Sequence, residues 1–219
     1  MAATMPTFLN RLFRPFTSST RMGFSPEGGA QVIPEGSQKA TVAAGCFWGV
    51  EHLYRKQFGG KGLLDARVGY IGGDTKSPSY RSVCSGRTGR KSLLIEFPGP
   101  VCVANKRDAA VDAEALQVTF DPNQVTFRQL LEFFYKMHDP TTKNRQGGDS
   151  GTQYRSAVFF HDEEQERTAK EVTEKAQKEW WRSGTISTQI LPAGEWWDAE
   201  KYHQLYLENN PGGYECPAQ

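Results

Sequence analysis

The chain has 219 residues, of which 37% are hydrophobic and 12% aromatic, so one domain can bury a full core without help from disulfides or metal ions. Its formal net charge is +1, from 26 Lys and Arg against 25 Asp and Glu, which gives no reason to expect a nucleic acid or an anionic membrane as a partner. No apolar stretch approaches the roughly 20 residues that a membrane-spanning helix needs. We therefore expect one soluble domain with tails.

The N-terminal stretch differs in composition from the rest of the chain. Its first 26 residues carry three arginines, several Ser and Thr, and no acid before Glu27. This composition suits either an organelle transit peptide or an unfolded extension. A Gly- and Pro-rich linker follows, so we expect the extension to cover residues 1–38 and the folded domain to cover residues 39–219. The expected location is the cytoplasm, with mitochondria as the alternative.

Strand-like and helix-like segments alternate through the folded domain. Strands are expected in KATVAA (39–44), LLDARVGYIGG (63–73), EALQVTFDP (114–122), SAVFFHD (156–162) and, as the last strand, TISTQIL (185–191). Helices are expected in FWGVEHLYRKQFGG (47–60), TFRQLLEFFYKMHDP (126–140), where Thr126 and Gln129 form a capping-box pattern, and DEEQERTAKEVTEKAQKEWW (162–181). The pattern predicts the α+β class: a single two-layer domain with a mixed sheet, helices packed on it, and a long C-terminal coil. It excludes a doubly wound nucleotide-binding fold, because no strand ends in a GxGxxG turn.

The stretch AAGCFWGVEH places Cys46 where an apolar strand turns into a helix. A thiol there faces unpaired backbone N–H groups and the positive end of the helix dipole, which lowers its pKa and favours the nucleophilic thiolate. The alternative is a buried packing cysteine, which is the commoner role. Trp48 favours the reactive role, because a fully buried indole is uncommon and its N–H needs a partner. Phe47 and Trp48 would then wall a shallow pocket that suits a methyl group on a polarisable atom.

The other thiols and the histidines show no known metal or catalytic pattern. The four cysteines, at positions 46, 84, 102 and 216, form no CxxC pair, and no His lies at zinc-finger spacing, so we expect neither a metal site nor a disulfide scaffold. A cysteine hydrolase would need a His and an orienting Asn or Asp, and no such constellation is evident. Of the four histidines only His52 is near Cys46 in the sequence, and a surface or core role is expected for it.

Several stretches together resemble one known family. They are GCFWGVEHLY, VGYIGGDTKSPSYRSVCSG, AEALQVTFDP, HDP, RQGGDSGTQYRSAVFF and YHQLYLENNPGGYEC. In this order they resemble the peptide methionine sulfoxide reductase A family over nearly the whole span from Lys39 to Cys216. The resemblance implies an oxidoreductase that repairs oxidative damage by reducing the S-epimer of methionine sulfoxide, protein-bound or free. It implies no cofactor, thioredoxin as the reductant, and, in our expectation, a monomer.

The resemblance also implies roles for individual residues. Cys46 would be the nucleophile that attacks the sulfoxide sulfur, and Glu114 would be the neutral carboxylic acid that protonates the oxygen. Tyr80 and Tyr154 would donate hydrogen bonds to that oxygen as charge develops. Without the resemblance, the tyrosines could be core residues and Glu114 an exposed strand residue.

The remaining implied roles concern binding and recycling. Phe47 and Trp48 would form the methyl pocket, and Asp149 would place a water or orient the Cys46 side chain, although a turn role would also explain this aspartate. Attack would leave Cys46 as a sulfenic acid, which a second thiol can condense to a disulfide. We favour Cys216, behind two glycines on a segment able to swing inwards, over Cys84, which fits a structural thiol at a strand end. A dithiol protein, thioredoxin, would reduce the Cys46–Cys216 disulfide.

One departure from the family pattern is large. The pattern runs TG-His-AEA, but here 23 residues, Arg90 to Asp112, stand where one histidine would be. The segment 90–112 is either a surface loop insertion or a retained intron that stays in frame. Possible codons favour the intron, because those for RKS at its start can contain GTAAGT, those for VD at its end can contain TAG, and splicing would restore a His codon. If the insertion displaced Glu114, the chain would be an inactive or redox-sensing isoform.

Overall fold

The structure is a computed structural model that describes residues 33–86, 88 and 111–214. The chain divides into two units, residues 1–32 and 33–219, and every described residue belongs to the second. Most of the predicted N-terminal extension and nearly all of the predicted insertion therefore lie outside the described residues. No helix in the described part of the chain is long and apolar enough to cross a membrane.

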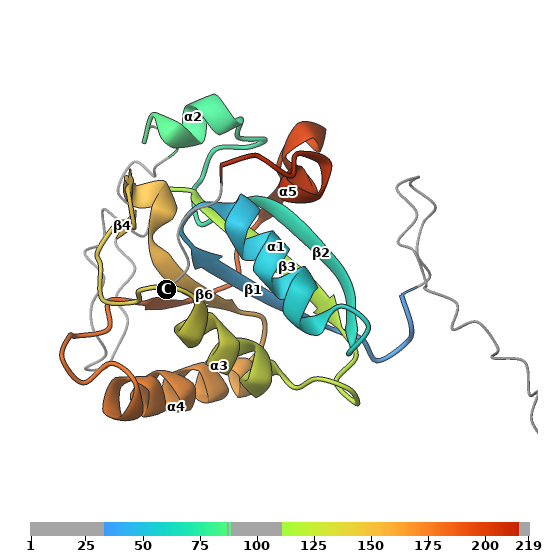
Figure 1. The fold of residues 1–219 in the computed structure, drawn as a ribbon, viewed down its shortest axis with the longest axis vertical. Coiled ribbons are helices and arrows are strands. Elements are labelled where there is room, and N and C mark those ends of the chain that lie inside the picture. The colour runs from blue at the N-terminus through green and yellow to red at the C-terminus, as the bar shows by residue number, and fades with distance from the viewer. Residues whose placement is uncertain (1–32, 87, 89–110, 215–219) are drawn as a thin grey trace, which may run out of the picture. The chain divides into compact units, whose positions relative to one another are not determined.

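A six-stranded mixed sheet organises the domain (Figure 1). In sheet order its strands are β7 (Gln189–Pro192), β6 (Ser156–Phe160), β1 (Gln38–Ala44), β3 (Ala113–Phe120), β2 (Leu63–Ile71) and β8 (Trp196–Asp198). Neighbouring strands are antiparallel, except for the parallel pair β6 and β7. The mixed sheet and the α+β class confirm the expectation from the sequence.

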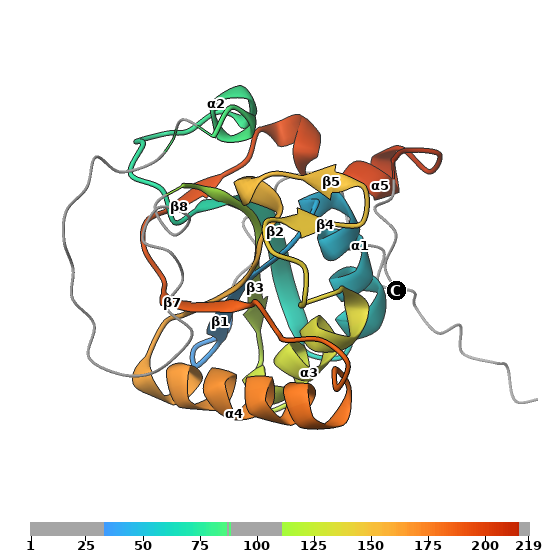
Figure 2. The same ribbon diagram turned by 90° about the vertical axis from the view of Figure 1, so that its left-hand side faces the viewer.

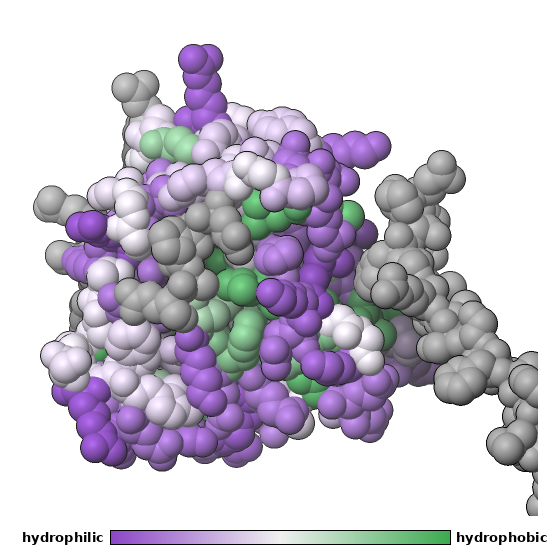
Figure 3. All heavy atoms as spheres, in the orientation of Figure 1, coloured by the Kyte–Doolittle hydropathy of each residue, from purple (hydrophilic) through white to green (hydrophobic). Residues whose placement is uncertain are grey.

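Three helices pack against the sheet: α1 (Phe47–Phe58), α3 (Phe127–Met137) and α4 (Glu163–Glu179). Because side chains alternate between the two faces of a strand, Val42, Val68 and Leu116 enter one large core cluster with these helices, whereas Ala43 and Ala115 enter a smaller cluster without them. On the face seen in Figure 3 the side chains are mainly hydrophilic, and apolar side chains come to the surface between α1 and α3. The two-layer prediction is confirmed.

The helix α3 begins with the hydrogen bonds that its local sequence predicts. The Thr126 side chain accepts a hydrogen bond from the backbone N–H of Gln129 at 3.2 Å, and Gln129 Oε1 accepts one from the backbone N–H of Thr126 at 2.8 Å. Each side chain thus satisfies an N–H that the first helical turn leaves without a partner. The predicted capping box is confirmed.

Several short elements were not predicted. They are α2 (Tyr80–Cys84), the β4 (Arg145–Gln146) and β5 (Asp149–Ser150) hairpin, the 3₁₀ turns η1 (Thr152–Tyr154) and η2 (Lys201–His203), and α5 (Tyr206–Asn209). In Figure 1 and Figure 2 the helices α2 and α5 and the hairpin all lie toward one end of the sheet.

Two predictions about elements were wrong. Cys84 ends the helix α2 and not a strand. The last strand is β8 and not the segment 185–191, because β8 pairs with β2, a contact between distant parts of the chain. The segment 185–191 becomes strand only from Gln189 onward, since the backbone N–H of Ser187 bonds the carbonyl of Pro140 at 2.7 Å.

Candidate active site

Cys46 is the N-cap residue of α1, one glycine after the end of β1, and its side chain is buried. Gly45 before it has a φ of +92°, a left-handed conformation that lets the strand turn sharply into the helix. A side chain at Gly45 would also collide with the Gln146 Cβ, at 2.6 Å from the ideal Cβ position. The glycine therefore brings the β4–β5 hairpin against the start of α1, where the thiol lies.

Glu114 lies on β3, on the face of the sheet that the helices cover, and is 1% exposed. Its Oε2 accepts a hydrogen bond from the backbone N–H of Phe47 at 3.2 Å, which places the carboxyl at the residue next to Cys46. Its Oε1 is buried with no hydrogen-bond partner in the described structure. Burial raises the pKa of Glu114 to about 8; the Phe47 N–H lowers it and the charge of Asp149 raises it. The carboxyl is therefore neutral at pH 7 and can donate a proton.

Tyr80, the first residue of α2, and Tyr154, the last residue of η1, meet at this carboxyl. The two tyrosines lie close enough to affect each other's pKa, and the charge of Glu114 raises the pKa of both hydroxyls. Burial raises the pKa of both tyrosines, so both stay protonated and can donate hydrogen bonds. The Cys84 thiol also acts on the pKa of Tyr80, which places this cysteine at the edge of the site.

Asp149 lies in β5, close enough for its charge to act on Glu114. Its Oδ1 accepts a hydrogen bond from the Tyr214 hydroxyl at 3.1 Å, and its Oδ2 is buried with no partner among the described residues. Tyr214 is the last described residue, and the predicted resolving Cys216 lies outside the described part, as does Cys102. The structure thus places Asp149, one of the predicted site residues, close to Glu114.

Phe47 and Trp48 occupy different depths. Phe47 is 1% exposed, and its ring centroid lies 5.9 Å from that of Tyr70 in the core. Trp48 is half-buried, and its ring stacks on Tyr206 with centroids 3.7 Å apart and planes 12° apart. Its Nε1–H donates to His203 Nδ1 at 3.0 Å, which supplies the partner that the indole was expected to need. Trp48 is therefore the more exposed of the two aromatic residues that follow Cys46.

Sequence reasoning missed two residues of this site, His203 and Glu200. His203 is 2% exposed and lies between Phe47 and Tyr80, at centroid distances of 5.1 and 4.7 Å. Glu200 accepts hydrogen bonds from the backbone N–H of Tyr80 at 3.0 Å and from the hydroxyl of Tyr70 at 2.8 Å. His203, far from Cys46 in the sequence, and not His52, is the histidine of the site. The available signal was its position between aromatics in YHQLY.

Two described residues at the ends of the predicted insertion, Thr88 shortly before it and Asp112 as its last residue, contact each other. The backbone N–H of Asp112 donates to Thr88 Oγ1 at 3.1 Å, and both residues are 1% exposed. Asp112 Oδ1 accepts a hydrogen bond from the backbone N–H of Gly73 at 2.9 Å. Asp112, directly before Ala113, therefore fills the position where the family pattern has its histidine, and β3 continues from it to Glu114. Within the described residues, no cluster of His, Cys, Asp and Glu could hold a metal ion.

Comparisons of the whole chain with known proteins match one family. The family model described as "Peptide methionine sulfoxide reductase" matches residues 38–97 and 101–219. The "Probable peptide methionine sulfoxide reductase" of Schizosaccharomyces pombe is 46% identical over 180 residues, which is 82% of this chain and 93% of the relative. The "Peptide methionine sulfoxide reductase MsrA" of a Mycobacterium species is 43% identical over 179 residues, 82% of this chain and 88% of the relative.

Solved structures give the same result. Reduced Mxr1 from Saccharomyces cerevisiae matches with a TM-score of 0.67 at 40% identity, covering 83% of this chain and 90% of Mxr1. Methionine sulfoxide reductase A of Corynebacterium diphtheriae matches with a TM-score of 0.68 at 36% identity, covering 84% and 79%. The resemblance in the sequence motifs is thereby confirmed. The chain belongs to the peptide methionine sulfoxide reductase family, a family of oxidoreductases.

Proposed function

We propose that this chain reduces the S-epimer of methionine sulfoxide, protein-bound or free, to methionine through a sulfenic acid on Cys46. The observation that carries the proposal is the buried Glu114 carboxyl at the backbone N–H of Phe47, one residue from the thiol at the helix start; its burial raises its pKa to about 8. A sulfoxide is reduced only if its oxygen is protonated while a nucleophile attacks its sulfur. The site holds both groups: the Cys46 thiol is at the start of α1, and the Glu114 carboxyl is on the neighbouring strand β3.

In the first step the Cys46 thiolate attacks the sulfoxide sulfur. Glu114 donates its proton to the oxygen, and Tyr80 and Tyr154 donate hydrogen bonds to the same oxygen as negative charge develops on it. The attack joins the Cys46 sulfur to the substrate sulfur. The protonated oxygen then transfers to the Cys46 sulfur as the substrate S–O bond and the new S–S bond both break, so that methionine leaves and Cys46 carries a sulfenic acid. Cys46 is thus oxidised by two electrons, and the sulfoxide is reduced by two.

In the second step the thiol of Cys216 attacks the sulfenic acid, so that a Cys46–Cys216 disulfide forms and water leaves. The dithiol of thioredoxin then reduces this disulfide through a mixed disulfide and regenerates both thiols. No bound cofactor takes part. The position of Cys216 in the sequence, behind two glycines near the C-terminus, supports its role as the second thiol.

The alternative, an inactive or redox-sensing isoform, requires that the insertion displace Glu114. Against it stand the Thr88–Asp112 hydrogen bond, which joins the ends of the interrupted loop, and the Phe47–Glu114 bond itself. Loop-closure entropy grows only slowly with length, so a long excursion between fixed ends costs little stability. We therefore favour an active enzyme.

The test is an assay of the purified full chain with separated S and R epimers of a methionine sulfoxide peptide and dithiothreitol. The proposal predicts methionine from the S-epimer only, and none in Cys46→Ser. Equal turnover of the two epimers would contradict the stereochemical part of the proposal. No turnover of either epimer by a folded, fully reduced chain would favour the redox-sensing isoform.

A further inference from the structure

The indole of Trp48 is fixed by two side chains from one segment, Ala199 to Tyr206. His203 Nδ1 accepts the indole N–H at 3.0 Å, and the ring of Tyr206 covers the indole face at a centroid distance of 3.7 Å. The first contact fixes the edge of the indole and the second fixes its plane. Trp48 is partly buried and lies two residues after Cys46, so the orientation of its indole bears on the surroundings of the thiol.

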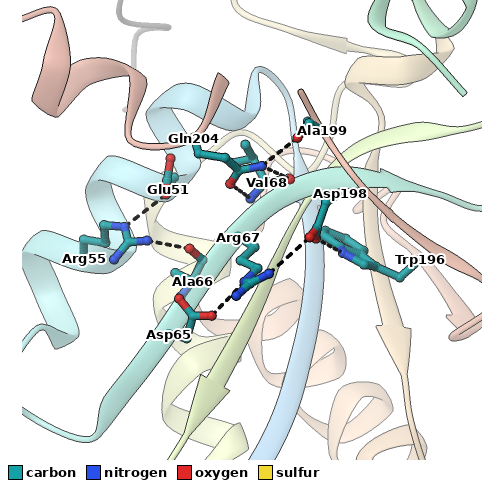
Figure 4. A network of polar contacts seen from close by, with 10 residues as sticks. All are labelled: Glu51, Arg55, Asp65, Ala66, Arg67, Val68, Trp196, Asp198, Ala199 and Gln204. Carbon is teal, nitrogen blue, oxygen red and sulfur yellow. Dashed lines mark hydrogen bonds and ion pairs between the residues drawn. The ribbon is translucent and has the colours of Figure 1, made fainter. Parts of the chain in front are cut away.

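The segment that carries His203 is itself anchored to α1 and, through Gln204, to the sheet, as Figure 4 shows for Gln204. The Gln204 amide forms a two-way pair with Val68 on β2, with Val68 N–H to Oε1 at 3.0 Å and Nε2–H to the Val68 carbonyl at 2.8 Å. The backbone N–H of Leu205 donates to Glu51 Oε2 at 2.8 Å, and Glu51 is buried on α1. The backbone that carries His203 is therefore fixed by hydrogen bonds to β2 and to α1.

Among the described residues, the His203 side chain takes part in one hydrogen bond, which Trp48 donates and Nδ1 accepts. Because Nδ1 accepts from the indole, a neutral ring carries its proton on Nε2. Nε2 is buried without a hydrogen-bond partner in the described structure, and Glu200 Oε2 lies 3.9 Å from it, beyond hydrogen-bonding distance. Burial lowers the pKa of His203, which keeps the ring neutral and its Nδ1 lone pair available. A ring nitrogen buried without a hydrogen-bond partner costs free energy. The Trp48 bond is the polar contact that the ring keeps in return.

We propose that His203 is a positioning residue, whose Nδ1 fixes the Trp48 indole as the wall of the pocket that receives the sulfoxide methyl group. The proposal rests on the proposed function for the identity of the ligand. It predicts that loss of the Nδ1 acceptor weakens substrate binding more than it slows the chemistry, because Cys46, Glu114 and the tyrosines keep their own contacts.

Two amide substitutions separate the hydrogen bond from packing. In His203→Asn the side-chain oxygen can take the place of Nδ1, whereas in His203→Gln the amide lies one bond farther out, near the place of Nε2. The indole N–H resonance of Trp48, assigned by its loss in Trp48→Phe, reports the hydrogen bond in the absence of substrate. We expect this resonance to shift upfield in His203→Gln and to stay near its original position in His203→Asn.

Kinetics supply the functional half of the test. We expect KM for an S-sulfoxide peptide to rise about tenfold in His203→Gln and to stay within about threefold in His203→Asn, as loss of one buried hydrogen bond would give. The rate at saturating substrate should change far less. In a Trp48→Phe background the two amides should have equal KM values. The control His161→Asn alters a histidine that bonds Thr41, outside this network, and should leave KM unchanged.

Two results would overturn the proposal: an unshifted indole resonance in His203→Gln, or KM values that rise equally for Asn and Gln while Trp48 is present. The resonance is read without substrate, so it decides on the hydrogen bond even if the chain reduces no sulfoxide. Inactivity of the unmodified chain would count against the proposed function and not against the Trp48–His203 contact.

Discussion

The backbone N–H of Phe47 donates a hydrogen bond to Glu114 Oε2 at 3.2 Å, and this contact joins the start of α1 to the middle of the sheet. It satisfies one N–H of the first helical turn with a buried carboxyl instead of a capping side chain. It also places an acid beside the predicted nucleophile. The predictions below follow from this pairing.

Glu114→Gln keeps the size of the side chain and an oxygen that can accept the Phe47 N–H, but it removes the acidic proton. We expect the rate of methionine formation to fall by about 10² to 10⁴, the usual contribution of a positioned general acid. Substrate binding should survive, because the tyrosines and Trp48 are untouched. Single-turnover kinetics at saturating sulfoxide measure the rate; a near-normal value across neutral pH would show that another group supplies the proton.

The pH dependence of activity follows from the same carboxyl. Glu114 donates a proton only while it is protonated, so kcat/KM should fall as pH rises through its pKa of about 8. Asp149→Asn removes a negative charge that raises this pKa, so the alkaline fall should move to lower pH. Glu164→Gln removes one charge from the exposed side of α4 and serves as the control. A fall at the same pH in Asp149→Asn and the unmodified chain would contradict the assignment.

Stability should depend on pH through Glu114 in the opposite sense from an ordinary paired carboxylate. Its folded pKa, about 8, lies above the ordinary value of 4.5, so its stabilising contribution is complete at low pH and is lost as pH rises from about 4.5 to 8. The loss is about 1.4 kcal/mol per pH unit within that window. Urea unfolding of the unmodified chain and of Glu114→Gln at pH 5, 7 and 9 measures it. The difference in unfolding free energy should shift in favour of the glutamine variant with rising pH, and parallel curves would argue against a buried neutral acid.

Replacing residues 90–112 by one histidine tests the insertion. Because Thr88 and Asp112 already lie within hydrogen-bonding distance, β3 should keep its register and Glu114 its place. The segment also contains the apolar run SLLIEF, which could pair with a sheet edge and promote aggregation. We therefore expect the shortened chain to be more soluble and at least as active.

A second deletion, of residues 90–111, serves as the control because it keeps Asp112 and its bond to Gly73. If both shortened chains were inactive and the full chain were active, the segment would contribute to the fold or to the site. Sequencing of the gene and its transcripts separates the two origins: absence of the GTAAGT and TAG junctions, or uniform retention of the segment in transcripts, would reject the intron and leave a true loop insertion.

The parts of the site that the sequence predicts are those encoded locally. Gly45 and Cys46 stand at a strand-to-helix junction, and hydrophobic periodicity marks both flanking elements. Glu114 required the family resemblance, because alternation along β3 alone cannot say whether its face is covered. His203 and Glu200 could not be predicted, since their contacts with Trp48 and Tyr80 depend on how a segment without clear periodicity folds back on β2 and α1. The strand β8 was missed for the same reason, because its pairing with β2 is long-range.

The most direct test of the account is the product of one turnover without reductant. The fully reduced chain is mixed with an excess of an S-sulfoxide peptide, and methionine and the oxidised cysteines are measured by mass spectrometry. We expect one methionine per chain and a Cys46–Cys216 disulfide, methionine and a trappable Cys46 sulfenic acid in Cys216→Ser, and no methionine in Cys46→Ser. Methionine formed by Cys46→Ser, or a disulfide that excludes Cys46, would contradict the assignment of the nucleophile.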